Sequence, residues 1–141
     1  MRYLVLVAIL ATSSASAQNY TSPYGEWRGQ AQYQAFIQAV SDPAAHVVTN
    51  LTIAIDPRGK VIGASTENGC RMLGIAAPGV IATSVKLDVT LQNCHYIGLN
   101  QTYKGNLTVH SKDRYATFSL QAVVISRGTG GTFNITSTMR R

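Results

Sequence analysis

The side chains that most often carry out chemistry are few in this sequence and lie far apart. No two carboxylates have the spacing that favours acid–base pairing of the glycosidase kind. No H-x-H, H-E-x-x-H or G-x-S-x-G motif occurs. We therefore expect a non-catalytic protein without a metal or cofactor, with an enzyme site assembled from distant strands as the alternative. The acids are Glu26, Asp42, Asp56, Glu67, Asp88 and Asp113, and the histidines are His46, His95 and His110.

Cys70 and Cys94 are the two cysteines of the chain. Their separation fits neither a C-x-x-C redox motif nor a paired zinc knuckle. Cysteine pairs of exported proteins usually form structural disulfides. We predict a Cys70–Cys94 disulfide, which closes a loop of about 25 residues and stabilises the fold by about 3 kcal/mol in the chain-entropy model.

The N-terminus has the three parts of a signal peptide. Arg2 supplies the positive charge, residues 4–11 (LVLVAILA) form a short apolar run, and residues 15–17 (ASA) are small enough for cleavage. The apolar run is far shorter than the ~20 residues that span a membrane as a helix. We predict a signal peptide over residues 1–17, cleavage after Ala17, and a periplasmic or secreted mature protein. An uncleaved anchor is the alternative.

The composition is that of a folded protein with a positive surface. Hydrophobic residues make up 45% of the chain and charged residues 13%, which is the reverse of the balance in disordered chains. The formal net charge is +6, or +5 once Arg2 leaves with the signal peptide. The basic residues are scattered rather than clustered, which argues against nucleic acid as a partner. The charge favours an acidic protein partner instead.

Alternating hydrophobicity predicts β-strands from Trp27 onward. Residues 25–38 (GEWRGQAQYQAFIQ) give the clearest example, because polar glutamines separate the apolar positions. A helix would mix the two sets around its axis, whereas a strand with one buried face separates them. The residues expected to face inward are Trp27, Gly29, Ala31, Tyr33, Ala35 and Ile37.

The same alternation recurs between turn sequences along the rest of the chain. About eight antiparallel strands in so short a chain predict an all-β fold over residues 18–141, an up-and-down β-barrel, with a β-sandwich as the alternative. Outer-membrane barrels share the alternation, but aromatic residues make up only 8% of the chain, so we expect no membrane span. The further strands are predicted at 47–55, 60–65, 70–76, 85–91, 102–110, 115–126 and 132–139, with turns at 56–59 (DPRG), 67–69 (ENG), 111–113 (SKD) and 128–131 (GTGG).

Gly25 and Trp27 on the first predicted strand resemble the G-x-W signature of the calycins, the lipocalin and avidin group of small up-and-down barrels. In that group a basic residue near the end of the last strand packs over the tryptophan. The resemblance implies that Arg140 stacks on Trp27 and that both residues have structural roles. Trp27 is the single tryptophan of the chain, whereas biotin pockets of the avidin group use several.

A second resemblance covers more of the chain. Residues 69–70 (GC) and 93–94 (NC), followed by residues 103–105 (YKG), are similar to small exported bacterial β-proteins with a cysteine pair. Those proteins have no assigned activity, so this resemblance implies a compartment and a fold but no function.

Elimination and compartment together favour a binding protein. We expect an exported, non-catalytic protein that acts on a protein partner in the cell envelope, as an inhibitor or immunity-type protein, and the positive charge favours an acidic partner. The alternative is a small-molecule or lipid carrier of the calycin type. A carrier needs an open interior of about 300 Å³ or more, for which small inward residues would leave room. An envelope component is a further alternative. The small inward residues are Gly29, Ala31, Ala35, Gly105, Ala116 and Ala122.

The export prediction has a direct test. Mature protein recovered from the periplasm or medium should begin at Gln18 and contain no free thiol, because cleavage follows Ala17 and both cysteines are paired. Intact-mass measurement of native material, with and without a thiol reagent, checks both points. A mass that includes residues 1–17, or labelling of Cys70 or Cys94 without reduction, would contradict them.

Overall fold

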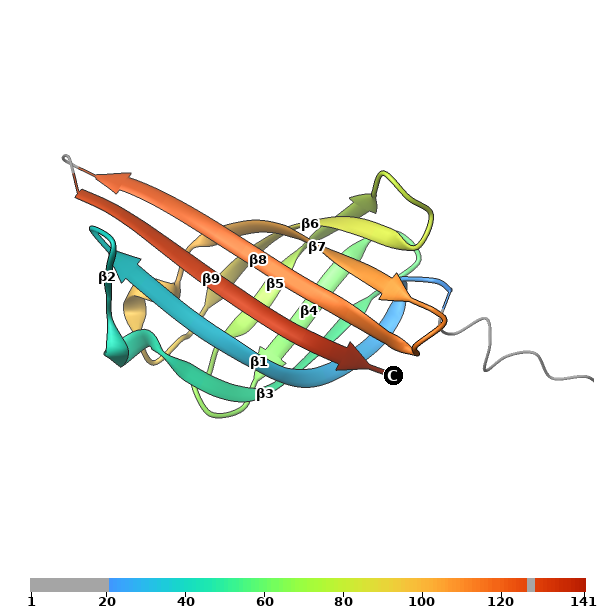
Figure 1. Ribbon diagram of the computed structural model, residues 1–141, viewed down its shortest axis with the longest axis horizontal. Helices are drawn as coiled ribbons and strands as arrows, with labels where there is room; N and C mark the ends of the chain where they lie inside the picture. Colours follow the sequence, from blue (N-terminus) through green and yellow to red (C-terminus); the bar gives the residue numbers. More distant parts are fainter. Residues whose placement is uncertain (1–20, 127–128) are drawn as a thin grey trace, which may run out of the picture.

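A computed structural model of the chain describes residues 21–126 and 129–141. The predicted signal peptide, Gln18 and Gly128 lie outside these residues. The described chain is all-β, and its strands agree closely with the predicted ranges (Figure 1). The elements are β1 (Gly25–Ile37), β2 (Val40–Ser41), η1 (Pro43–Ala45), β3 (Val47–Ile55), β4 (Lys60–Ser65), β5 (Arg71–Pro78), β6 (Ser84–Gln92), η2 (Ile97–Leu99), β7 (Thr102–His110), β8 (Tyr115–Ser126) and β9 (Thr129–Arg140).

The strands form a closed antiparallel barrel, which confirms the predicted fold class. Each long strand pairs with the next along the chain, in the order β1-β3-β4-β5-β6-β7-β8-β9. The cylinder closes because β1 also pairs with β9, from Arg28 opposite Arg140 to Ile37 opposite Gly131. The two-residue strand β2 was not predicted; it folds back on the end of β1.

Turn chemistry sets the register of the hairpin between β3 and β4. The Asp56 carboxylate accepts hydrogen bonds from the backbone N–H groups of Arg58 and Lys60. Gly59 has a φ of 92°, and a Cβ there would lie 2.4 Å from the carbonyl oxygen of Ala76. Only glycine fits that position, so the predicted DPRG turn is confirmed.

The predicted glycine-rich turn at residues 128–131 needs a correction. β9 begins at Thr129, and Gly130 and Gly131 already pair with Ile125 and Val124 of β8. Glycine in a strand leaves space for a close neighbour, and here the side chain of Ile37 lies 3.2 Å from where a Cβ of Gly131 would stand. The hairpin is therefore longer than the sequence predicted.

The interior of the barrel is filled by side chains from every long strand. β3 shows the pattern: Leu51, Ile53 and Ile55 are buried, while the residues between them are exposed. Side chains alternate between the two faces of a strand, so closure of the barrel buries every second residue, and these residues are mostly apolar. The largest fully buried side chains are Trp27, Tyr33, Tyr103, Leu51, Ile53, Ile55, Met72, Leu91, Leu99, Leu107, Leu120 and Ile135.

Trp27 closes one end of the barrel together with a C-terminal arginine. Its indole N–H donates to the carbonyl oxygen of Pro23 at 2.8 Å. The guanidinium of Arg141, not of Arg140, lies over the ring, 4.1 Å from the centroid, and Arg141 also donates to the carbonyl of Ser22. This corrects the role predicted for Arg140.

The alternation of β9 explains the correction. Met139 points inward and is fully buried, so Arg140 must point outward, where it donates to the carbonyl of Arg114. Arg141, one residue further, returns to the side of the indole.

The disulfide lies at the opposite end. Cys70, after the β4–β5 turn, is bonded to Cys94, which follows β6, as predicted. Two short 3-10 helices cover this end and bury Ala45 and Leu99. Asp42 accepts a hydrogen bond from the Tyr96 hydroxyl, which joins the two covers across the opening. No helix in the described ranges is long and apolar enough to cross a membrane.

Removing the closing arginine tests the corrected assignment. Arg141→Ala should lower the free energy of unfolding by about 1–2 kcal/mol, since it removes a stacked cation and a hydrogen bond. Arg140→Ala, which changes an exposed side chain, should stay within about 0.5 kcal/mol of wild type. Trp27→Ala should cost about 3–5 kcal/mol.

Urea unfolding followed by circular dichroism measures all three variants. Equal losses for Arg140→Ala and Arg141→Ala would contradict the assignment.

Candidate interaction surface

The acids and histidines singled out in the sequence do not come together. In residues 21–126 and 129–141, no three or more His, Cys, Asp or Glu side chains are grouped so that they could hold a metal ion. His46 bonds to Ser41 beside the ring of Phe36. His110 stacks on Tyr115 at the other end of the barrel. His46 and His110 therefore each have an ordinary local partner, and the backbone N–H of His95 donates to the carbonyl oxygen of Asn68.

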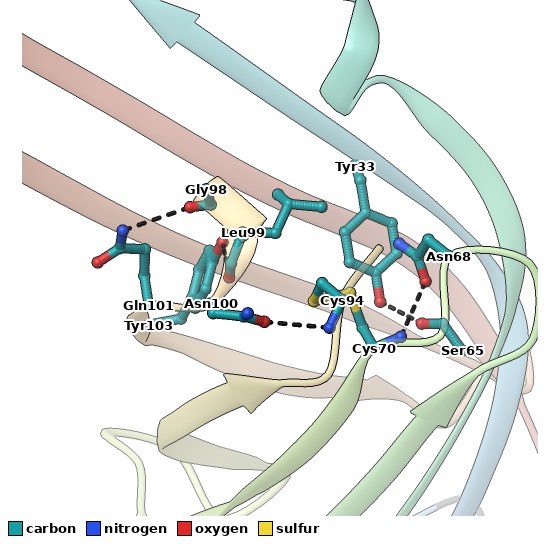
Figure 2. The surroundings of a disulfide bond; sticks show 10 residues. All are labelled: Tyr33, Ser65, Asn68, Cys70, Cys94, Gly98, Leu99, Asn100, Gln101 and Tyr103. Atoms are coloured by element: carbon teal, nitrogen blue, oxygen red, sulfur yellow. Dashed lines mark hydrogen bonds between the residues drawn. A yellow bond between two sulfur atoms is a disulfide. The ribbon is translucent and has the colours of Figure 1, made fainter. Parts of the chain in front are cut away.

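A buried polar cluster surrounds the disulfide, as Figure 2 shows. The hydroxyl of Tyr33 shares a hydrogen bond with that of Ser65. The side-chain oxygen of Asn68 accepts from the backbone N–H of Cys70 at 3.4 Å. The hydroxyl of Tyr103 donates to the carbonyl oxygen of Leu99 at 2.9 Å. The first bond joins β1 to the end of β4, the second lies within the turn before Cys70, and the third joins β7 to η2.

Burial raises the pKa of both tyrosines in this cluster. Tyr33 and Tyr103 have no exposed surface, so the charged phenolate is disfavoured. The hydrogen bonds of Tyr33 with Ser65 and Asn68 oppose part of this effect. A second phenol nearby raises the pKa of Tyr103 further. Both groups stay neutral in the physiological range, which suits a structural role.

The small inward residues do not leave a ligand cavity where they lie. A Cβ on Gly29 would lie 2.4 Å from the carbonyl oxygen of Thr138, and one on Gly105 would lie 1.8 Å from that of Ser119. The neighbouring backbone therefore occupies the space that a side chain would take. Ala31 and Ala35, the other small inward residues of β1, are fully buried. Small residues here allow close strand packing rather than an open interior.

The outer face of β4 and β5 is apolar although it faces solvent. We call the outward side chains Ile62, Ala64, Leu73, Ile75 and Ala77 the apolar patch. The strand register places Ile62 directly opposite Leu73. Ile75 is 64% exposed, and Ile62 and Leu73 are about half exposed. A sheet face toward water usually alternates to polar residues, so a contiguous apolar group marks a contact surface.

The hairpin loop after β5 continues this apolar character. Val80 is 92% exposed and Ile81 is 54% exposed. The loop follows Pro78, the last residue of β5, and the hydroxyl of Ser84 closes it by donating to the carbonyl of Ile81.

Basic residues border the apolar patch. The register places Lys60 opposite Ile75, and Arg71 opposite Ala64. On the other side Lys86 lies opposite Ala77. We call Lys60, Arg71, Lys86 and Lys104 the basic rim. The ion pair found in the described part of the chain joins Arg28 to Glu26, so no cation of the basic rim is in an ion pair there.

A shallow depression lies at the edge of the apolar patch. Its volume is about 430 Å³, and its lining includes Ile75, Ala77, Lys86 and Lys104. Asp88, the acid at this edge, stands directly opposite Lys104 in the register. Asp88 also lies opposite Ile75 and lines the depression, so its apolar floor has two lysines and one carboxylate beside it.

Sequence reasoning missed the apolar patch. The signal lies in residues 72–77 (MLGIAA), which are apolar or small at every position and so predict apolar side chains on both faces of the strand. No family model matches the sequence, and neither curated proteins nor solved structures gave a match. The calycin resemblance at Gly25 and Trp27 therefore stays a prediction.

The buried tyrosines predict a loss of stability in alkali. Their folded-state pKa lies above the unfolded value of about 10, so the stability they contribute is complete below pH 10 and is lost as the pH rises further. Tyr103 should cost about 1.4 kcal/mol between pH 9 and pH 11, because it ionises only in the unfolded chain, and Tyr33 adds a loss in the same direction.

Tyr103→Phe should reduce this alkaline loss by about that amount, although it is less stable at pH 7 by about 1 kcal/mol. Urea unfolding at pH 7, 9 and 11 is the measurement. An alkaline loss equal to that of wild type would show that Tyr103 ionises in the folded barrel.

Proposed function

We propose that this chain is an exported, non-catalytic binding protein that uses the apolar patch and basic rim to hold an acidic protein partner in the cell envelope. The chain blocks the activity of that partner and so acts as an inhibitor or immunity-type protein. The observation that carries the proposal is the apolar outer face of β4 and β5, with four cations around it.

The chemistry of the surface favours a protein over a small molecule. Its apolar centre lies on a wall of paired strands rather than in an enclosed cavity, and such a flat shape fits another protein surface. Burial of Ile62, Leu73 and Ile75 supplies the hydrophobic contribution, at about 25 cal/mol per Å². The backbone is held by the barrel, so little ordering entropy opposes binding.

The basic rim adds selectivity. Its four cations outnumber Asp88, the carboxylate opposite Ile75, so the surface repels basic proteins and attracts acidic ones, which raises the association rate with an acidic partner. The rim also makes association sensitive to salt, because exposed charges are screened over about 8 Å at physiological ionic strength. An acidic partner with an apolar centre and carboxylates around it complements this surface.

A matched pair of substitutions tests the proposal. Ile75→Glu places a negative charge inside the apolar patch, whereas Val48→Glu places the same charge on the outer face of β3 at a site of similar exposure, 55% against 64%. Both side chains point away from the core, so both variants should fold. Ile75→Glu should weaken partner binding at least 10-fold, and Val48→Glu should change it less than 2-fold.

The partner is found with immobilised mature protein and an envelope extract of the source cells, then purified. Support requires an acidic exported protein that binds the purified chain directly in calorimetry and binds more weakly at 300 mM than at 50 mM salt. If the partner is an enzyme or toxin, one equivalent of the chain should suppress its activity.

Equal binding by the Ile75→Glu and Val48→Glu variants would overturn the proposed surface. A shift of several degrees in melting temperature with one class of fatty acid or lipid would favour the carrier instead.

A further inference from the structure

The hairpin of β8 and β9 extends beyond β7, the strand that pairs with β8 on the side away from β9. The pairing of β7 with β8 runs from His110 opposite Tyr115 only as far as Lys104 opposite Gln121. The pairing of β8 with β9 continues to Ser126 opposite Thr129. We call residues 122–126 of β8 the free edge, because among the described residues no strand pairs with the side that β7 leaves. Figure 1 shows β8 continuing past the start of β7, while β1 and β2 lie along the other side of the hairpin.

The free edge lacks the protection that edge strands usually have. Its sequence is AVVIS, and positions 115–139 contain one charged residue, Arg127. Val123 is 64% exposed and Ile125 is 80% exposed, both on the outer face. Natural sheets protect exposed edges with lysine, proline, bulges or covering segments. An unprotected apolar edge has main-chain N–H and C=O groups ready for another extended strand.

The sequence of the free edge is self-complementary. In an antiparallel pair with a two-fold axis at Val124, Val123 lies opposite Ile125 of the other copy, and Ala122 lies opposite Ser126. In this register each residue lies opposite a residue of the same face, so the outward side chains of both copies stay on the outer face of the joined sheet. It brings exposed β-branched side chains together in cross-strand pairs, which stabilise sheets. No like charges oppose one another.

We propose that the free edge of β8 pairs with the free edge of a second copy of this chain, antiparallel and centred on Val124. The same segment serves on both subunits, as a two-fold interface requires. A heterologous peptide would also find main-chain partners, but the neutral edge carries nothing that selects one sequence over another. The interface is short and therefore weak, so dimers should form at tens to hundreds of micromolar protein.

The dimer goes beyond the proposed function and does not depend on it. In the order of the closed barrel, β4 and β8 are separated by three strands in either direction. The apolar patch on β4 and β5 therefore lies on the side of the barrel away from the free edge. A dimer would leave both patches open and would bind a clustered partner with higher avidity.

Charge substitutions test the register. Sedimentation velocity from 5 to 500 µM should show wild type shifting from monomer to dimer. Val123→Lys/Ile125→Lys should stay monomeric, because the register places a lysine of one copy directly opposite a lysine of the other at both cross-strand pairs. Val123→Lys/Ile125→Glu removes the same apolar area but opposes a lysine at position 123 to a glutamate at position 125, so it should retain the dimer.

Cysteine substitutions test the axis. Val124→Cys should form an intermolecular disulfide under mild oxidation, since an on-axis residue faces its own copy at about 4.5–5.5 Å between Cα atoms. Val123→Cys faces Ile125 and should cross-link at least 10-fold more slowly. Similar cross-linking of the two variants, or a dimer that persists with two lysines, would overturn the register.

A monomeric wild type at every concentration would overturn the dimer. The control variant Ile75→Glu should dimerise normally, which separates the two proposals: loss of partner binding with an intact dimer affects only the proposed function. If wild type is monomeric and the two-lysine variant loses the partner, the free edge binds a partner strand and the self-pairing proposal fails.

Discussion

The pairing of β1 with β9 is the interaction on which the rest of the structure depends. Without this pairing the strands would form an open sheet whose apolar face is exposed to water. With it they form a cylinder that encloses every second residue. The contact is close because Gly29 has no side chain in the path of the Thr138 carbonyl, and the hydroxyl of Ser137 donates to the carbonyl of Gln30 at 2.7 Å. An eight-stranded cylinder is just wide enough for side chains to fill, which is why large buried residues occupy it.

Closure also explains which parts of the fold the sequence could predict. Strand ranges and the barrel followed from period-two alternation, because each strand buries one face. The role predicted for Arg140 was wrong by one residue. The calycin resemblance implied a cation near the end of the last strand but not which face of the strand it lies on, and a strand changes face at every residue. Counting from the inward Met139 leads to Arg141. The small strand β2 was missed because two residues carry no periodic signal.

The outer surface was harder to predict for a physical reason. Alternation identifies the inward set only when the other set is polar, and in β5 Leu73 and Ile75 are as apolar as the inward Met72. The patch also needs the register of two strands, which brings Ile62 beside Leu73. Register depends on turn geometry and on pairing across the hairpin, so one strand's sequence does not contain it.

Unequal strand lengths allow one small barrel to present two different kinds of surface. β7 pairs with β8 only from Tyr115 to Gln121, and its first residues, Thr102 and Tyr103, pair with β6, so the end of the 12-residue β8 extends beyond its neighbour. Where a strand is paired on both sides, main-chain groups are satisfied and only side chains reach a partner, as on β4 and β5. Where one side is unpaired, main-chain groups become the contact. A side-chain surface selects partners by shape and charge, whereas a bare edge selects only for an extended strand, and another copy of the same edge always meets that condition.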